Sequence, residues 1–192
     1  MIKYARVMNK ETKICEVGLG TDKDFYESIG MEEMEVEQAY DGNWYVKGYA
    51  PTQPLDELKQ AKLTEVDQWT ASKITGGFVS TCYNGENILY DTDTETQLTM
   101  TKARANCEGE RFAQAFPNGM GVRGYAQNGT DADGTMVFAN TKTVYNFLPE
   151  HIIAWDEDFS LHLAKCKYEG WMKQAQVNAC TTKEELESIV LE

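Results

Sequence analysis

Two prolines near residue 50 divide the sequence into parts with different hydrophobic periods. Pro51 and Pro54 lack a backbone N–H, so the chain around them cannot pair fully in a sheet. Before them, apolar residues mostly alternate with polar ones, which is the period of a half-buried strand. After them, apolar residues recur at helical spacing. The sequence therefore predicts two modules that are joined by a linker over residues 50–54.

The first part predicts a small ββαββ module. Alternating residues on both sides of Asn9–Thr12 indicate one hairpin, and the turn around Gly42 indicates a second. Between the hairpins, acidic residues near Asp22 precede a short apolar stretch that ends at Gly30, which is typical of a two-turn helix.

Beyond the linker, an amphipathic connecting helix leads into the second module. Apolar residues from Leu55 to about Lys73 fall within one arc of this helix, and Gly76 and Gly77 end it. A hairpin follows, in which Asn84 and Gly85 form the turn. We expect module boundaries at residues 1–50, 51–75 and 76–192, and an α+β fold class for the whole chain.

The rest of the second module predicts helices, further strands and one irregular segment. Thr94 and Gln97 have the spacing of a capping box at a helix start. Several glycines after Pro117 predict a long segment without regular structure as far as Gly134. Two short strands, at 137–138 and 144–147, should come next.

The longest helix is predicted at the C-terminal end of the chain. It opens at Pro149 and extends as far as Cys180, with Gly170 as the point where it can break. A capping box of Thr181 and Glu184 then predicts a short final helix. The second module should therefore contain β-hairpins and a long C-terminal helix.

Charge and cysteine content limit the partners and the compartment. The net charge of −13 repels phosphate backbones and anionic bilayers, so we expect neither nucleic acid nor membrane as a partner. The five cysteines include no C-x-x-C pair, which fits reduced thiols in a cytoplasm. No stretch has the length and hydrophobicity of a signal peptide or a membrane span. We expect the protein to fold in the cytoplasm.

Two acidic clusters are candidate cation sites with simpler interpretations. Asp91, Asp93 and Glu95 alternate, yet the later glycine and glutamate of a calcium loop are missing, so a strand end and a helix cap explain them better. Asp131 and Asp133 lie in a glycine-rich stretch that is typical of turns.

The two histidines offer little for catalysis or metal binding. His151 and His162 are too far apart along one helix to share an ion, and His162 with Cys166 is better explained by packing. The sequence contains no nucleophile elbow, phosphate loop or H-E-x-x-H motif. We expect no catalytic residues, no metal site, no cofactor and no enzymatic activity.

Four aromatic residues form a candidate interaction surface beside the Gly42 turn. They are Tyr40, Trp44, Tyr45 and Tyr49. Such rings are common at protein and sugar contacts. A small module also uses rings as its core, and this second interpretation has the greater weight.

Two stretches resemble phage proteins. The opening, YARVMNKETKICEVGLGTDKDFYESIGMEEMEVEQAYDGNWYVKGYAP, is similar to the N-terminal segment of small proteins encoded beside tail-fibre genes in phages and prophages of Gram-positive bacteria. The rest resembles an uncharacterised domain of tail-fibre and tail-fibre-assembly proteins, through Tyr90–Asp93 and Thr181–Ile189. Residues 108–128 depart from the family pattern.

The resemblance implies a non-enzymatic, tail-associated protein. It would be a tail-fibre or baseplate component, or a fibre-assembly accessory, that acts through protein–protein contacts in the host cytoplasm during assembly or in the virion tail. The predicted long helix suits a homo-oligomer. The alternative, motivated by the charge of −13, is an acidic phage anti-defence protein that inhibits a host nuclease or immune effector.

Overall fold

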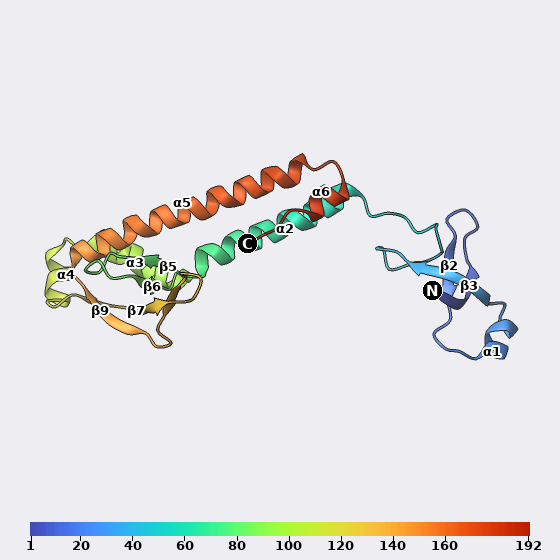
Figure 1. Cartoon of the computed structure of the whole chain (residues 1–192), viewed down its shortest axis with the longest axis horizontal. Helices are drawn as coiled ribbons and strands as arrows, with labels where there is room; N and C mark the ends of the chain where they lie inside the picture. Colours follow the sequence, from blue (N-terminus) through green and yellow to red (C-terminus); the bar gives the residue numbers. More distant parts are fainter. The chain divides into compact units, whose positions relative to one another are not determined.

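The computed structural model describes all 192 residues, which form two compact units over residues 1–58 and 59–192 (Figure 1). Both units combine helices with antiparallel strands, so the expected α+β class is confirmed. The division falls in the first turn of α2 (Leu55–Thr75), so most of this helix belongs to the second unit. None of the helices is both long and apolar enough to cross a bilayer.

The first unit has the predicted ββαββ order. Its elements are β1 (Ile2–Val7), β2 (Ile14–Val17), α1 (Lys23–Ser28), β3 (Glu32–Gln38) and β4 (Trp44–Val46). The strands close into a small antiparallel barrel in the order β1-β2-β4-β3. Ala5, Cys15 and Val36 are buried at its centre. Asp22 caps α1, because its Oδ1 accepts the Phe25 N–H at 3.1 Å.

The second unit packs helices on one sheet. After α2 come β5 (Phe78–Ser80), β6 (Ile88–Tyr90), α3 (Thr94–Asn106), α4 (Glu110–Ala115), β7 (Met120–Thr130), β8 (Met136–Phe138), β9 (Thr143–Phe147), α5 (Pro149–Ala179) and α6 (Lys183–Glu187). Strands β5, β6 and β7 pair in sequence, and β8 and β9 both pair with β7.

The segment predicted to be irregular, 117–134, contains the longest strand of the chain. Strand β7 occupies Met120–Thr130, and helix α4 ends just before the segment, at Ala115. The prediction for 117–134 was wrong because its glycines serve close packing as well as turns. A Cβ on Gly124 would lie 2.5 Å from Ile88 Cγ2, so this position needs the bare backbone.

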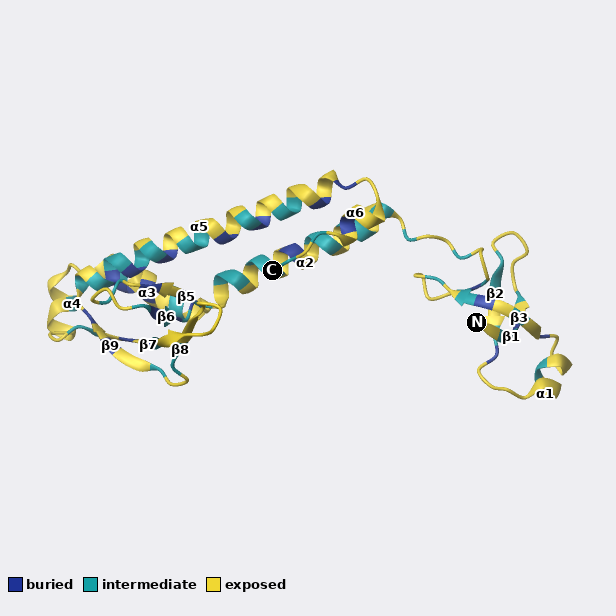
Figure 2. Cartoon of the chain, viewed as in Figure 1, coloured by how far each residue is buried: buried dark blue, intermediate teal, exposed yellow.

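The core of the second unit lies between the sheet and helices α3 and α5 (Figure 2). Trp155 and Ile152 of α5 are almost fully buried there, together with Ile88, Tyr90 and Phe147 of the strands. The Trp155 ring meets the Phe78 ring edge-on, with centroids 5.3 Å apart. This core fixes the N-terminal half of α5 on the sheet.

The C-terminal half of α5 lies antiparallel to α2 (Figure 1). Lys59 Nζ donates to the Asn178 carbonyl at 3.0 Å, and Lys73 pairs with Glu169 at 2.7 Å. Helix α5 runs unbroken through Gly170, so the chain does not use this point as a break. A Cβ on Gly170 would lie 2.4 Å from Thr70 Oγ1, and the glycine therefore permits the close approach of the two helices.

Gly170→Ala is expected to destabilise the second unit by about 1 kcal/mol, because the overlap with Thr70 outweighs the better helix propensity of alanine. In a Thr70→Ala background the same change should stabilise, by up to about 1 kcal/mol. Urea unfolding of the four proteins measures the coupling. Equal effects of Gly170→Ala in both backgrounds would contradict the close approach.

Two helix starts differ by one residue from the predicted capping boxes. Asp93, not Thr94, caps α3, and its carboxylate accepts the backbone N–H groups of Glu95 and Thr96 at 2.9 and 3.0 Å. Thr182 with Glu185 forms the capping box of α6, in place of Thr181 with Glu184. In both cases a neighbouring residue with a suitable oxygen takes the cap.

The cap at Asp93 predicts a pH effect on stability. Hydrogen bonds, the Thr96 N–H first among them, hold the pKa of Asp93 below its usual range. Its contribution is therefore present above the unfolded pKa of about 3.9 and is lost as the pH falls through the lower folded pKa. Asp93→Asn keeps the acceptor, so we expect a shallower loss of unfolding free energy between about pH 5 and 3 than in the wild type. Identical pH profiles would contradict this role.

Candidate interaction surface

The four aromatic residues predicted as an interaction surface are divided between the interior and the surface of the first unit. Tyr45 is buried, and its hydroxyl donates to Asp41 Oδ2 at 2.7 Å. Trp44 is partly buried against the barrel core. Tyr40 and Tyr49 are exposed by 48% and 57%. Only these last two rings are presented to solvent, whereas Trp44 and Tyr45 serve the core of the small barrel.

The acidic candidates have structural partners. Asp91 forms an ion pair with Lys142, and Asp93 caps α3. Asp131 Oδ1 accepts the N–H groups of Asp133 and Thr135 at 3.0 and 2.9 Å, which closes the turn between β7 and β8. No three His, Cys, Asp or Glu side chains converge on a common metal position.

His162 and Cys166 lie together on the side of α5 that faces α2. The Cys166 Sγ is 3.6 Å from His162 Nε2, which also lies 3.2 Å from the Lys73 carbonyl. Burial raises the pKa of the Cys166 thiol, which favours the neutral form. The His162 ring stacks on Phe78 at 5.5 Å. Both side chains are part of the packing between α5 and the rest of the unit.

Helix α5 carries a second apolar stripe on the side away from α2. Its large members are Leu161, Tyr168, Trp171 and Met172, exposed by 71%, 61%, 63% and 47%. Three exposed alanines, Ala164, Ala175 and Ala179, complete it. At 3.6 residues per turn these seven positions fall within an arc of about 100°. We call this stripe the α5 outer face.

Helix α2, which lies beside α5, does not expose large apolar side chains. The exposed residues of α2 are polar or alanine, for example Gln60, Thr64 and Gln68. Helix α2 therefore has one apolar side, which packs inward, as expected for a surface helix. Helix α5 has two, because Phe159, Cys166 and Val177 fill the inward side and the outer face lies opposite. A helix that is apolar on two sides normally has neighbours on both.

Two lysines flank the α5 outer face. Lys165 lies on one side of the stripe and Lys167 on the other. Between Ser160 and Ala179 these are the only exposed charged residues. Glu169 and Lys173 are half-buried and engaged elsewhere, with Lys73 and with the C-terminal segment. The outer face is thus apolar with basic margins.

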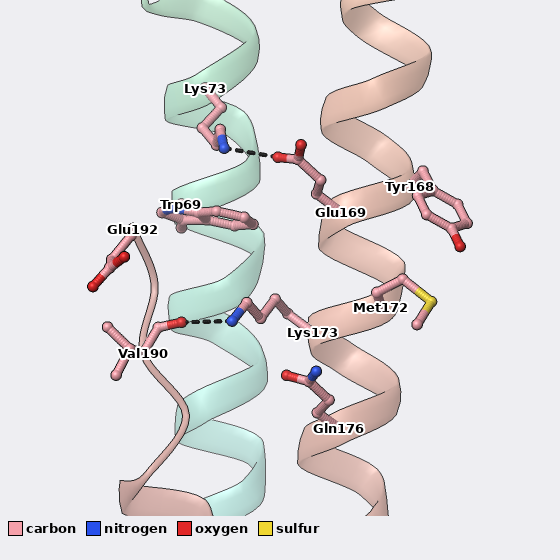
Figure 3. Close-up of a pocket in the computed structure, with 9 residues that line it drawn as sticks. All are labelled: Trp69, Lys73, Tyr168, Glu169, Met172, Lys173, Gln176, Val190 and Glu192. Carbon is pink, nitrogen blue, oxygen red and sulfur yellow. Dashed lines mark hydrogen bonds and ion pairs between the residues drawn. The ribbon is translucent and has the colours of Figure 1, made fainter.

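A shallow groove borders the outer face on its α2 side (Figure 3). It has a volume of about 440 Å³ and lies among α2, α5 and the C-terminal segment. Lys173 Nζ donates to the Val190 carbonyl at 2.7 Å, and the Lys73 ammonium lies 4.6 Å from the Trp69 ring centroid. Figure 3 shows Tyr168 and Met172 on the side of α5 away from α2, so they connect the groove rim with the outer face.

The sequence contains a signal for the outer face, but it is easily overlooked because Trp155, Phe159 and Cys166 already have helical spacing. That inward series explains the helix, while Leu161, Tyr168 and Met172 form a second helical series two residues out of step. No protein-family model, curated protein or solved structure matches this chain. The α5 outer face is therefore the feature from which a function is best inferred.

Proposed function

We propose that this protein is a non-enzymatic component of a phage tail, either a tail-fibre or baseplate protein or a fibre-assembly accessory, that acts through protein–protein contacts. The observation that carries the proposal is the α5 outer face. It exposes four large apolar side chains along 161–172 of α5. Contact between such an apolar stripe and water is unfavourable, and binding to a partner would bury the stripe.

The composition of the outer face suits a protein contact. Trp, Tyr and Met are enriched at the centres of interfaces, and Trp and Tyr are the residues whose truncation most often weakens binding. Trp171 and Tyr168 lie side by side on the outer face, one turn apart. Leu161 extends the apolar contact by two further turns toward the N-terminus of α5.

The phage assignment rests on the resemblance of Tyr90–Asp93 and Thr181–Ile189 to tail-fibre and fibre-assembly proteins. Tyr90 is a core residue at the end of β6, and Asp93 is the cap of α3. The second segment holds the α6 capping box and the buried Leu186. These residues have structural roles in the unit that carries α5, and the expected partner is a tail-fibre or baseplate protein.

Co-expression with the tail-fibre and baseplate proteins of the same phage, followed by size-exclusion chromatography with light scattering, tests the proposal. We expect a stable complex with one of them. If the protein forms no complex with any of them and instead binds a host nuclease, the tail function is contradicted. That outcome would favour the anti-defence alternative, which the charge of −13 motivates.

A further inference from the structure

We propose that the α5 outer face binds an amphipathic helix of the partner, whose own apolar seam is flanked by acidic side chains. This inference rests on the proposed function, because it names the element that the partner supplies. It follows from two properties of the outer face, its spacing and the sign of its flanking charges.

The spacing fits a helix as the occupant. Leu161, Ala164, Tyr168, Trp171 and Ala175 alternate steps of three and four, which is the pattern of coiled-coil a and d positions. The stripe from 161 to 179 is about 27 Å long at 1.5 Å per residue, enough for a partner helix of about five turns. The alanines between the larger residues leave room for side chains of the partner, as in knobs-into-holes packing.

The two flanking lysines indicate which charges the partner helix should carry. With Leu161 at a, Lys165 takes an e position and Lys167 a g position, so one lysine stands on each side of the seam. These are the positions that set partner choice in coiled coils. Neither lysine has an ion pair within the chain, whereas Lys62 and Lys73 of α2 pair with Glu65 and Glu169. A helix with glutamate or aspartate opposite both would satisfy them.

A second copy of this chain fits the face less well. Along the outer face, over 160–179, its own e and g positions hold no acidic residue, since they are Ser160, Lys165, Lys167, Met172, Gln174 and Ala179. The e position before them is Asp158, which accepts a hydrogen bond from Ser80. The charge pattern therefore favours a different chain as the occupant.

Two matched peptides test the inference on the full chain. Each is a three-heptad helix with leucine at a and d; one carries glutamate at all e and g positions and the other lysine. Like charges keep each peptide from pairing with itself. Fluorescence anisotropy at physiological salt, where charges beyond about 8 Å are screened, compares their affinities. We expect the acidic peptide to bind on the order of tenfold more tightly.

The double variant Lys165→Glu/Lys167→Glu should reverse this preference, and Trp171→Glu should weaken both peptides. Equal binding, preference of the wild type for the basic peptide, or a wild-type dimer that Trp171→Glu dissociates would overturn the inference. If a tail complex that depends on Trp171 forms but the acidic peptide is not preferred, only this inference fails. If no tail complex forms at all, the proposed function fails independently of the peptides.

Discussion

Trp171→Glu is expected to weaken the complex with the tail partner by about 2 to 4 kcal/mol, or roughly 30- to 700-fold in Kd. The indole is exposed by 63% in the free chain and stands at the middle of the α5 outer face. In the complex a carboxylate at this position would be desolvated without an opposite charge. Titration of the partner against both proteins measures the difference.

The matched control is Gln68→Glu on the exposed polar side of α2. It adds the same charge to the other helix of the pair, and we expect no change in Kd beyond about twofold. Both substitutions are at exposed positions, so each should leave the free energy of unfolding within about 0.5 kcal/mol of the wild type. Equal weakening by both would point to net charge, and no weakening by Trp171→Glu would exclude the outer face as the contact.

Trp155→Ala is expected to have the largest effect on stability, with a loss of about 3 to 5 kcal/mol. The side chain is 1% exposed and packs against Phe78 and Phe159, with ring centroids 5.3 and 5.2 Å away. Removing it leaves a cavity where α5 meets the sheet. The helical circular dichroism signal, which comes mostly from the second unit, reports the transition in urea.

A second substitution, Trp155→Phe, separates the effect of the ring contacts from that of the indole N–H. The indole Nε1 is buried without a hydrogen-bond acceptor, so the wild type already bears the cost of an unsatisfied donor. Phenylalanine removes that donor and keeps most of the ring contact, and we expect a loss of about 1 kcal/mol or less. A loss as large as that of alanine would show that the indole makes a polar contact in solution.

The first unit was predictable because its signals are local. The alternating stretches, the Gly42 turn and the acidic helix start at Asp22 each determine a few neighbouring residues, and the strands β1 to β4 follow. The barrel closure was not predictable, because the pairing of β1 with β3 depends on residues about 30 apart in the chain. Periodicity shows which residues face inward, but not which strands pair.

Glycine was the main source of error in the second unit. Gly124 and Gly170 look like breakers in the sequence, yet one lies in a strand and the other in a helix. Each accommodates a neighbour, Ile88 or Thr70, that comes from a distant part of the chain. A single sequence does not distinguish a glycine that ends an element from one that permits close packing.

The candidate surface was only partly accessible to sequence reasoning. Aromatic residues near Gly42 were chosen for their composition, but alternation along β4 buries Tyr45. The α5 outer face is visible in the sequence as a second apolar series, but only the packing of α2 and the sheet decides which of the two series remains exposed. The distinction depends on tertiary structure.

Hydroxyl-radical footprinting of the free chain and of its complex with the tail partner tests the central claim most directly. Tyr168, Trp171 and Met172 are exposed and readily oxidised, and Tyr40 and Tyr49 of the first unit serve as exposed controls in the same sample. We expect oxidation of the three α5 residues to fall severalfold in the complex while the two tyrosines stay unchanged. Protection of Tyr40 and Tyr49 without protection of α5 would contradict the outer face as the binding surface.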